Sequence, residues 1–356
     1  MRIQMNLSQN LKAKPTDESK LGFGRIFSDH MLMINYTEGQ GWHDARVEPY
    51  GNLSLDPACQ VLHYGQEIFE GMKCYRTPQG DFNLFRPEEN FKRMAHSSER
   101  MGMAVLDVQD GLDSLMALLS ADKEWTPHEE GAALYIRPTM IATDVYLGVN
   151  ASKTYLYYVL LSPSGAYYAS GLAPVGIYVE DELVRAVRGG IGFAKTGGNY
   201  AASILASVNA KHSGYAQVLW LDGVHQRYIE EVGAMNMMFV YGGKKMVTPA
   251  LNGSILPGIT RDSVLKLGKK LGYEVEEVRM DIQDVMADMK AGKITEAFGT
   301  GTAAVVSPVN KISFKGEEIC IGDGGIGVIT QKLYDTLTGI QFGRIDDPMG
   351  WVVKVK

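Results

Sequence analysis

The sequence predicts a mixed α/β protein with two domains, and three observations lead to this prediction. The chain has 356 residues, which is more than the roughly 100–200 residues that one domain usually holds. Strand-like and helix-like patterns are interspersed without a strict strand–helix rhythm, and no GxGxxG segment follows the first strand, so a Rossmann domain is disfavoured. A segment rich in Gly and Ser at 162–171 is the best candidate for a connection between domains.

The expected domain boundaries follow from this segment. Residues 1–20 are polar and indicate a loosely ordered, flexible arm rather than a targeting signal. The other boundaries give a smaller N-terminal domain at 21–162, an interdomain loop at 163–173 and a larger C-terminal domain at 174–356.

Hydrophobic spacing places the individual elements. In the N-terminal half it predicts a helix at 87–101 and strands at 81–85, 133–136 and 155–161. In the C-terminal half it predicts helices at 199–212, 259–271 and 281–291, and strands at 175–179, 217–221, 235–241, 245–248, 273–279 and 294–306, the last of them broken by Gly299 and Gly301. The helix at 199–212 is expected to share one apolar face among Ala201, Ile204, Leu205 and Val208.

The composition argues against several classes of protein. Lysine and arginine total 35 against 41 acidic residues, so the net charge is 35 − 41 = −6; with no basic stripe or tail, nucleic acid is not an expected partner. No apolar run approaches the roughly 18 residues that would span a membrane. The cysteines Cys59, Cys74 and Cys320 form neither a disulfide framework nor a CxxC pair, and the histidines lack ligand spacing. We therefore expect a cytoplasmic protein that binds no metal.

Lys195 is the most informative residue, because it lies in the glycine-rich run GGIGFAKTGGNY at 189–200. Glycine costs roughly 0.5–1 kcal/mol relative to alanine, and this cost is tolerated where the local backbone geometry matters. A partly desolvated lysine amine can lose its proton and attack a carbonyl. Lys195 is therefore the candidate anchor for a carbonyl cofactor, with pyridoxal phosphate (PLP) first in line. Considered alone, it would be an ordinary surface lysine.

Two turns could bind the phosphate of such a cofactor. The run LPGITR at 256–261 leads a Pro-Gly turn into a helix N-terminus, where free N–H groups and the helix dipole attract an anion. The run GTGTA at 299–303 could close over the same anion with hydroxyl and N–H groups. Each run alone is also consistent with a plain turn, in which Thr260 caps the helix.

One glutamate and two arginines complete the candidates. Glu231 lies between polar sequence and an apolar strand, where a buried carboxylate could keep a pyridine nitrogen protonated; a solvated strand end is the alternative. Arg86 and Arg137 each follow strand-like residues and precede a proline, which presents a guanidinium at a strand end. Arginine suits bidentate binding of carboxylate or phosphate, although a surface salt bridge is the default for either residue.

Taken together, these segments resemble those of the branched-chain amino acid aminotransferases, which are PLP enzymes of fold type IV. The resemblance runs from about Leu21 to Gly343 and rests on motifs in the family's order: GFG at 22–24 with DHM at 29–31, HYGQEIFEGMK at 63–73, LFRP at 84–87, YIRP at 135–138, KTGGNY at 195–200, EVGAMN at 231–236, LPG at 256–258 and FGTGTA at 298–303. It implies two domains with the cofactor between them. The implied activity is ping-pong transamination between L-leucine, L-isoleucine or L-valine and 2-oxoglutarate, giving 2-oxo acids and L-glutamate.

The resemblance also implies a role for each matched residue. Lys195 would be the Schiff-base lysine and proton shuttle, Glu231 would bond the pyridine nitrogen, and Tyr200 would bond the phenolic oxygen. The phosphate would be bound by Arg86, Ile259, Thr260 and Thr302. The substrate would be bound by Tyr64, Phe69, Tyr135, Arg137, Thr302 and Ala303. Among these, Arg137 would accept the distal carboxylate of glutamate, and Tyr64 would reach in from the other subunit of a homodimer.

Several alternatives stand beside this resemblance. D-amino acid aminotransferases and aminodeoxychorismate lyases have a similar fold with a comparable lysine and glutamate, and a non-catalytic PLP-binding protein would have to lack a catalytic group. Lys73 competes with Lys195 for the Schiff base but lacks a glycine-rich approach and lies in the half of the chain without phosphate turns. The chain also departs from some members, which carry a CxxC where it reads AVVS at 304–307 and often Thr where Ala234 stands.

Overall fold

The computed structural model describes residues 1–165 and 172–355. Residues 166–171 and 356 lie outside the described part, and with them the middle of the expected interdomain loop at 163–173. The chain divides into two compact units. The N-terminal unit comprises the described residues of Met1–Ala169, Ala194–Gly197 and Gly339–Lys356, and the C-terminal unit those of Ser170–Phe193 and Gly198–Thr338.

These units differ from the expected domains in relative size, because the N-terminal unit, expected to be the smaller, spans more residues than the C-terminal unit. They also differ at two of the expected boundaries. The C-terminal domain was expected to run without interruption from 174 to 356, but Ala194–Gly197 and Gly339–Lys356 belong to the N-terminal unit. The arm expected at 1–20 is also not free of the fold, because β1 (Gln4–Met5) pairs in parallel with β3 (Gly41–Pro49). In both cases backbone pairing that is remote in sequence decides where a segment belongs.

A nine-stranded sheet forms the frame of the N-terminal unit, in the order β1-β3-β2-β8-β7-β5-β6-β18, with β4 pairing to β7. The C-terminal strand β18 pairs antiparallel with β6, which attaches the end of the chain to this unit. The other strands are β2 (His30–Thr37), β4 (Glu67–Phe69), β5 (Met72–Arg76), β6 (Phe82–Phe85), β7 (Ala133–Ala142), β8 (Thr154–Ser164) and β18 (Val352–Val355).

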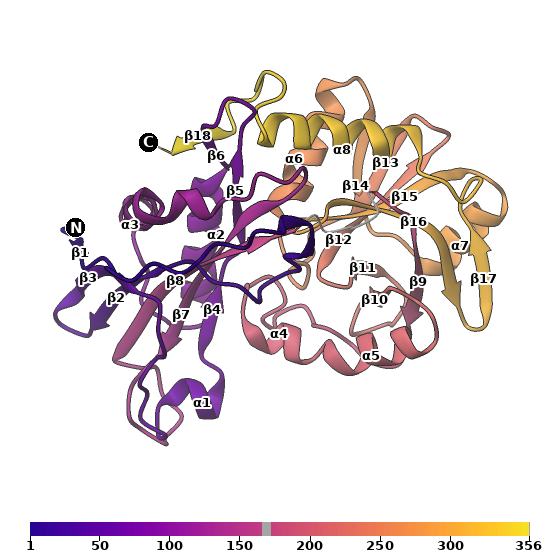
Figure 1. Cartoon of the computed structure of the whole chain (residues 1–356). Coiled ribbons are helices and arrows are strands. Elements are labelled where there is room, and N and C mark those ends of the chain that lie inside the picture. The colour runs from indigo at the N-terminus through magenta and orange to yellow at the C-terminus, as the bar shows by residue number, and fades with distance from the viewer. Residues whose placement is uncertain (166–171, 356) are drawn as a thin grey trace. The chain divides into compact units, whose positions relative to one another are not determined.

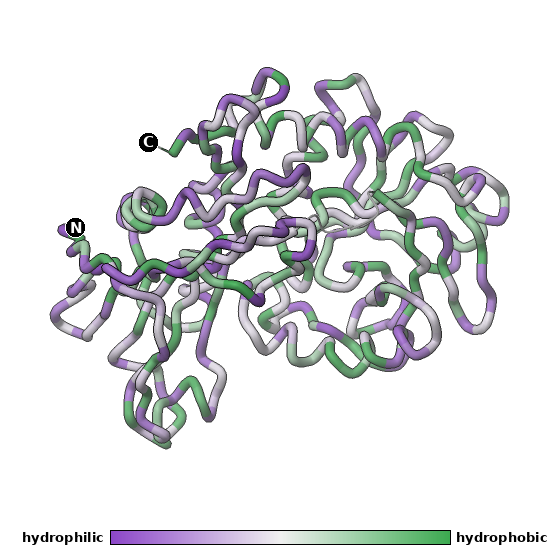
Figure 2. The backbone as a smooth tube through the Cα atoms, viewed as in Figure 1, coloured by the Kyte–Doolittle hydropathy of each residue, from purple (hydrophilic) through white to green (hydrophobic). Residues whose placement is uncertain are grey.

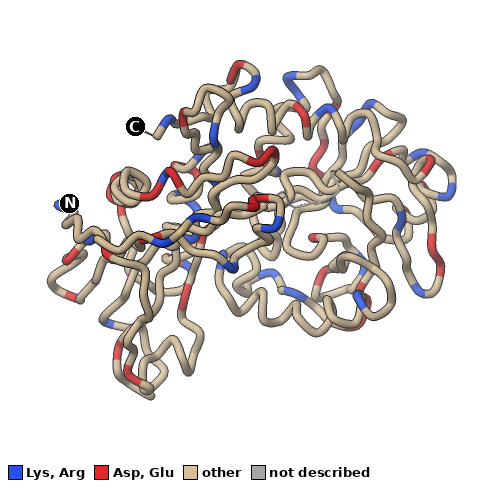
Figure 3. The backbone as a smooth tube through the Cα atoms, in the orientation of Figure 1, with Lys and Arg blue, Asp and Glu red and all other residues tan. Residues whose placement is uncertain are grey.

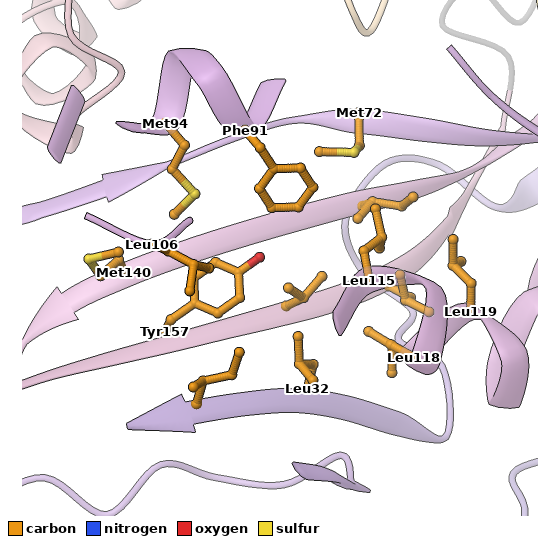
Figure 4. Close-up of a cluster of buried hydrophobic side chains, with 14 of the residues drawn as sticks. Leu32, Met72, Phe91, Met94, Leu106, Leu115, Leu118, Leu119, Met140 and Tyr157 are labelled. Atoms are coloured by element: carbon orange, nitrogen blue, oxygen red, sulfur yellow. The ribbon is translucent and has the colours of Figure 1, made fainter. Parts of the chain in front are cut away.

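Two helices, α2 (Pro87–Arg100) and α3 (Val108–Asp122), pack on this sheet (Figure 1). Pro87 favours the start of α2, because its fixed φ suits the first helical position and its missing N–H would have no partner there. Figure 4 shows Phe91 and Met94 of α2 and Leu115 of α3 among the side chains of one buried cluster. Burying a Phe or Leu side chain contributes about 1.5–3 kcal/mol, so this cluster fixes α2 on the sheet.

The short helices of the N-terminal unit lie in its connections. They are α1 (Gln60–Tyr64), η1 (Glu18–Lys20) and η2 (Lys123–Trp125). The helix predicted at 87–101 and the strands predicted at 81–85, 133–136 and 155–161 are confirmed, since α2, β6, β7 and β8 occupy these positions.

The C-terminal unit contains a second nine-stranded sheet, in the order β11-β10-β9-β16-β15-β12-β13-β14, with β17 pairing to β16. Because β11 also pairs with β12, the strands from β11 to β12 close into a ring. Closure leaves no unpaired edge on these strands. The strands are β9 (Val175–Glu180), β10 (Gln217–Leu221), β11 (Ile229–Val232), β12 (Met235–Tyr241), β13 (Lys245–Pro249), β14 (Glu274–Val278), β15 (Ile294–Gly301), β16 (Val305–Phe314) and β17 (Glu317–Cys320).

Helices of the C-terminal half follow the predicted positions in two of three cases. The predictions at 259–271 and 281–291 are confirmed by α6 (Ile259–Lys270) and α7 (Ile282–Lys290). The strand predicted at 294–306, with breaks at Gly299 and Gly301, is two strands, β15 and β16, which are joined by a turn at 302–304, with Val305 at a φ of 61°. The remaining helices are α4 (Gly197–Ala201), α5 (Ile204–His212) and α8 (Val328–Gln341).

The helix predicted at 199–212 is wrong in its length and in its buried face. It is divided into α4 and α5, and Leu205 on α5 is 60% exposed, although much of α5 is hydrophobic in Figure 2. The residues that are buried instead are Ala206 and Ala210, which pack with Trp220 of β10. Small side chains let the helix backbone approach the large indole, so size rather than hydrophobicity selects the inner face.

Charges and cysteines are distributed without concentration in one place. Acidic and basic residues are interspersed along the chain in both units (Figure 3). Cys59 and Cys74 are buried, Cys320 is exposed, and all three are free thiols. Of the described residues, none lies in a helix that is both long enough and apolar enough to cross a membrane.

The contrast between Ala206 and Leu205 gives a stability prediction. Ala206→Leu places extra volume against Trp220 and is expected to lower the free energy of unfolding by about 1–3 kcal/mol, as overpacking does. Leu205→Ala on the same helix is expected to change it by less than about 0.5 kcal/mol, because the side chain is exposed. Urea unfolding of the two variants measures both values. If Leu205→Ala lowered the free energy of unfolding more than Ala206→Leu did, the buried face predicted from the sequence would be supported instead.

Candidate active site

Lys195 is held by main-chain hydrogen bonds within the N-terminal unit. Its N–H donates to Ser97 Oγ on α2 (3.0 Å), and its carbonyl oxygen accepts from the Phe69 N–H at the end of β4 (2.9 Å). The next residue, Thr196, donates its hydroxyl to the Glu67 carbonyl (2.7 Å). The segment therefore lies along β4 as an added piece of the N-terminal unit, with Lys195 itself half-buried.

Two of the glycines around Lys195 lie where a side chain would not fit. A Cβ at Gly192 would overlap the Ser254 carbonyl, and a Cβ at Gly197 would overlap the Glu67 carboxylate. Burial raises the pKa of the Glu67 carboxyl, and a hydrogen bond from the Gly197 N–H partly offsets that rise. The glycine-rich run thus allows close backbone approach on both sides of Lys195.

Lys195 and the predicted substrate residue Arg137 both lie against the ring of Phe69, and Arg137 also contacts Tyr135. The Lys195 amine is 4.9 Å from the centroid of the Phe69 ring, and the Arg137 guanidinium carbon is 4.7 Å from the same centroid. Arg137 also donates to the Tyr135 hydroxyl (2.9 Å). Cations over aromatic faces gain about 0.5–2 kcal/mol, so these contacts favour the cluster. The N-terminal unit by itself brings together an amine, a guanidinium and a phenol.

Lys73 lies beside this cluster on the sheet. It is opposite Tyr135 in the register of β5 and β7, so the two side chains share a face. Burial lowers the pKa of the Lys73 amine to about 8. Lys73 lies in the half of the chain without phosphate turns, but Lys195 belongs to the same N-terminal unit as Lys73. The position of Lys73 in the sequence therefore does not distinguish the two lysines as candidates for the Schiff base.

Arg86 and Tyr64 make other contacts in the same unit. Arg86 directly follows β6, as its Arg-Pro pattern predicts, and is the N-cap of α2 with a φ of 50°. Its guanidinium carbon lies 5.3 Å from the centroid of the Trp351 ring, and its backbone N–H donates to the Trp351 carbonyl (2.8 Å). Tyr64 ends α1, is 44% exposed and donates its hydroxyl to the Leu147 carbonyl.

Glu231 is the buried carboxylate of the C-terminal unit. It lies on β11 with 3% of its surface exposed. Its Oε2 is 3.0 Å from Arg185 Nε, and its Oε1 accepts from the Leu256 N–H (2.8 Å) and from Asn236 Nδ2 (3.3 Å). A buried carboxylate is tolerated when it is paired and hydrogen-bonded, and Glu231 is both.

The two expected phosphate turns adjoin this carboxylate. Gly258 is the N-cap of α6 and offers no side-chain acceptor, and a Cβ there would overlap the Asn236 side chain. Ile259 and Thr260 form the first positions of α6. In the other turn, Thr300 of β15 is opposite Asn236 of β12. Asn236 therefore lies against both turns.

The remaining predicted residues of this unit lie in short connecting elements. Thr302 and Ala303 form the turn between β15 and β16 and are half-buried. Tyr200 lies on α4 and is half-buried, and its neighbour Asn199 donates to the Ile191 carbonyl (2.9 Å). This bond connects α4 to the first part of the glycine-rich run.

Arg185, Asn236 and Ser97 were missed by reasoning from the sequence. Asn236 was visible as the one amide in an apolar strand, and Arg185 as a single arginine in the apolar stretch LVRAV at 183–187. Ser97 gave no signal, because a serine in a helix is common and its partner is 98 residues away. Contacts at long sequence separation explain why Arg185 and Ser97 were missed.

The Arg185–Glu231 pair gives a second prediction. Arg185→Met leaves a buried carboxylate without its cation and is expected to lower the free energy of unfolding by about 3–5 kcal/mol. Adding Glu231→Met removes the carboxylate as well and is expected to recover much of the loss. Urea unfolding of the cofactor-free protein measures the cycle; strictly additive losses would show that the two side chains are not coupled.

The comparisons with known proteins agree with one another. Residues 67–312 match the family model described as amino-transferase class IV. The chain is 53% identical over 354 residues to a probable branched-chain-amino-acid aminotransferase of Staphylococcus aureus, covering 99% of this chain and 98% of the relative. It is 52% identical over 345 residues to branched-chain-amino-acid transaminase 1 of Bacillus subtilis, covering 97% and 96%.

Solved structures show the same family and fold. The branched-chain amino acid aminotransferase of Escherichia coli superposes with a TM-score of 0.76 at 28% identity, over 91% of this chain and 99% of that chain. The T.th. enzyme of the same name, solved with pyridoxamine 5'-phosphate, gives a TM-score of 0.75 at 27% identity, over 91% and 98%. The mixed α/β architecture of fold type IV expected from the resemblance is confirmed. The chain belongs to the class IV aminotransferases and, among them, to the branched-chain amino acid aminotransferases.

Proposed function

We propose that this aminotransferase exchanges the amino group between L-leucine, L-isoleucine or L-valine and 2-oxoglutarate, with PLP as cofactor and in a ping-pong sequence. The observation that supports this most is the cluster in the N-terminal unit, where the Lys195 amine and the Arg137 guanidinium lie against the same Phe69 ring. An amine, an apolar ring and a guanidinium that could bind a carboxylate are the groups that such an exchange requires.

The residues present fit PLP in two observable respects. The Glu231 carboxylate is buried and paired with Arg185, and a buried carboxylate could bind a protonated pyridine nitrogen. The N-terminus of α6 has a glycine cap without a side-chain acceptor, which suits a phosphate. The T.th. relative was also solved in complex with N-(5'-phosphopyridoxyl)-L-glutamate, which joins the cofactor to one proposed substrate.

When bound, PLP supplies an electron sink for the negative charge that develops at the substrate Cα. Lys195 would anchor the cofactor covalently; once the substrate amino group has displaced it from the cofactor, its free amine would move the proton from the substrate Cα to the cofactor C4′. Glu231 would bond the pyridine nitrogen, and Tyr200 the phenolic oxygen. The phosphate would be bound by Arg86, the backbone of Ile259 and Thr260, and Thr302.

Substrate selection would depend on the surroundings of the Phe69 ring. Tyr135 and the N–H groups at Thr302 and Ala303 would bind the α-carboxylate. Phe69 and Tyr64 would contact an apolar side chain, whose burial is worth about 25 cal/mol per Å². Arg137 would accept the distal carboxylate of glutamate.

We also propose that the enzyme is a homodimer in which Tyr64 serves the site of the other subunit. The support is the exposed apolar surface around Tyr64: Leu147, to which its hydroxyl bonds, is 60% exposed, and Val149 is 86% exposed. Burial of these side chains by a second copy would be favourable. Sedimentation equilibrium is expected to give twice the chain mass; a monomer with full activity would contradict the proposal.

The two lysines of the N-terminal unit provide the test of mechanism. Lys195→Ala is expected to lower kcat/KM for L-leucine by about 10⁴-fold or more, the upper end of what a general acid–base group contributes. Lys73→Met keeps the proposed anchor and is the matched control. Borohydride reduction of the PLP-loaded enzyme followed by peptide mapping should label Lys195. A label on Lys73 would assign the anchor to the other amine.

Spectroscopy of the half-reactions tests the substrates. Excess L-leucine without an oxo acid is expected to convert the cofactor to its amine form, and 2-oxoglutarate is expected to restore the PLP spectrum. A response to D-alanine but not to L-leucine would indicate the opposite stereochemistry and contradict the proposal.

A further inference from the structure

One side of α2 connects the Lys195 segment with a buried carboxylate. Asn90, Arg93 and Ser97 are spaced by three and four residues, so they share a face of the helix. All three are buried, with exposures of 3%, 8% and 1%. Asn90 and Arg93 bind Glu70, and Ser97 binds Lys195. The three polar residues thus join the end of β4 to the lysine through one helix.

Glu70 is the carboxylate at one end of this arrangement. It has no exposed surface, and it directly follows Phe69, which is the last residue of β4. Arg93 binds it through two parallel bonds, Nε to Oε1 and Nη2 to Oε2, each 2.8 Å, and Asn90 Nδ2 donates to Oε2 (2.7 Å). Burial alone would raise the pKa of the Glu70 carboxyl, but the Arg93 charge and hydrogen bonds outweigh it and hold this pKa below its usual range.

Lys195 lies at the other end and is bound at both of its main-chain groups. The Lys195 N–H donates to Ser97 Oγ on α2 (3.0 Å), and its carbonyl accepts from the N–H of Phe69 (2.9 Å), the residue before Glu70. The Glu70–Arg93 pair holds these two supports, α2 and the end of β4, to each other. A displacement of one relative to the other would have to break the buried pair or a Lys195 bond.

We propose that Ser97, supported by the buried Glu70–Arg93 pair, is a positioning residue for Lys195: it fixes the lysine main chain to α2 and so sets where the amine lies over the Phe69 ring. This inference rests on the proposed function, in which Lys195 carries the chemistry. Neither Ser97 nor Glu70 would touch the substrate. A misplacement of about 1 Å of a reacting group can cost about 100-fold in rate, so such a support has catalytic weight.

The neighbouring serine provides a matched control. Ser98 is also on α2 and has no exposed surface, but within 1–165 and 172–355 its hydroxyl has no hydrogen-bond partner. Ser97→Ala and Ser98→Ala remove the same atom from adjacent buried positions. Only the first removes the acceptor of the Lys195 N–H. A general loss of packing would affect both variants alike.

The test measures the Lys195 amide directly. In the cofactor-free enzyme, Ser97→Ala is expected to speed hydrogen–deuterium exchange of the Lys195 amide by about 10-fold, the effect of losing one hydrogen bond. Ser98→Ala is expected to leave it unchanged. Mass spectrometry with fragmentation across residues 193–200 resolves this amide.

Kinetics then connect the bond to function. In the PLP-loaded enzyme, Ser97→Ala is expected to lower kcat for L-leucine by about 10-fold with KM within about twofold, because the substrate contacts are intact. Ser98→Ala should match the wild type in both constants. Equal exchange and equal kcat in the two variants would overturn the proposal, as would faster exchange in Ser97→Ala without a fall in kcat.

A second variant addresses the buried pair, and a third separates the two proposals. Glu70→Gln with Arg93→Gln removes both charges together and is expected to speed hydrogen–deuterium exchange of the Lys195 amide, although neither residue touches that amide; unchanged exchange would remove the pair from the proposal.

If Lys195→Ala remained active, the proposed function would fail. The exchange result for Ser97→Ala would then still report on the bond itself.

Discussion

A carboxylate taken out of water must be paired or hydrogen-bonded, and each unit of this chain holds one that is buried against an arginine beside candidate active-site residues. In the N-terminal unit it is Glu70, bound by Arg93 with two parallel bonds. In the C-terminal unit it is Glu231, paired with Arg185. Leaving either carboxylate unpaired would cost several kcal/mol, roughly 3–5, so each pair fixes the relative position of the elements that carry it. Here those elements also carry the candidate active-site residues.

The consequence is clearest for Lys195. Its neighbours in sequence on both sides belong to the C-terminal unit, yet the four residues Ala194–Gly197 belong to the N-terminal unit. Glycine makes this passage possible, because a Cβ at Gly197 would collide with Glu67. The glycine-rich run is therefore an adaptation to a chain that leaves one unit, docks on the other and returns. The high glycine content around Lys195 therefore has a structural cause, the close approach of this segment to the N-terminal unit.

The sequence predicted well where the signal is local. The helix at 87–101 shows apolar spacing, and the one at 259–271 begins after a Pro-Gly turn and ends at Gly272; α2 and α6 match them closely. The motif residues could also be identified, because each is a chemically distinctive residue in a recognisable neighbourhood. The spacing of apolar residues therefore suffices to predict a helix when the residues that it places on one face are the ones that are buried.

Prediction failed where burial depends on a partner remote in the chain. Hydrophobic spacing assigns Leu205 to a buried face, but α5 turns Ala206 toward Trp220, whose size decides the fit. For the same reason, no local pattern indicates that Ala194–Gly197 belongs to the N-terminal unit, where the Lys195 carbonyl accepts from the Phe69 N–H. Arg185 and Ser97 were missed because each matters through one remote contact. Arg185 pairs with the Glu231 carboxylate, and Ser97 accepts the hydrogen bond of the Lys195 N–H.

The same physical view explains how one site could accept two unlike side chains. A guanidinium has charged edges but weakly hydrated faces, so it can stack on aromatic rings without the full cost of burying an ammonium. Arg137 lies over both Phe69 and Tyr135 and donates to the Tyr135 hydroxyl. In the proposed reaction its edge would bind the distal carboxylate of glutamate, while the Phe69 ring would receive a branched aliphatic chain. Stacking would hold the Arg137 charge in position for glutamate and keep its face covered by the rings when a branched aliphatic substrate binds. The enzyme would then accept the two kinds of substrate in turn without a rearrangement of the sheet.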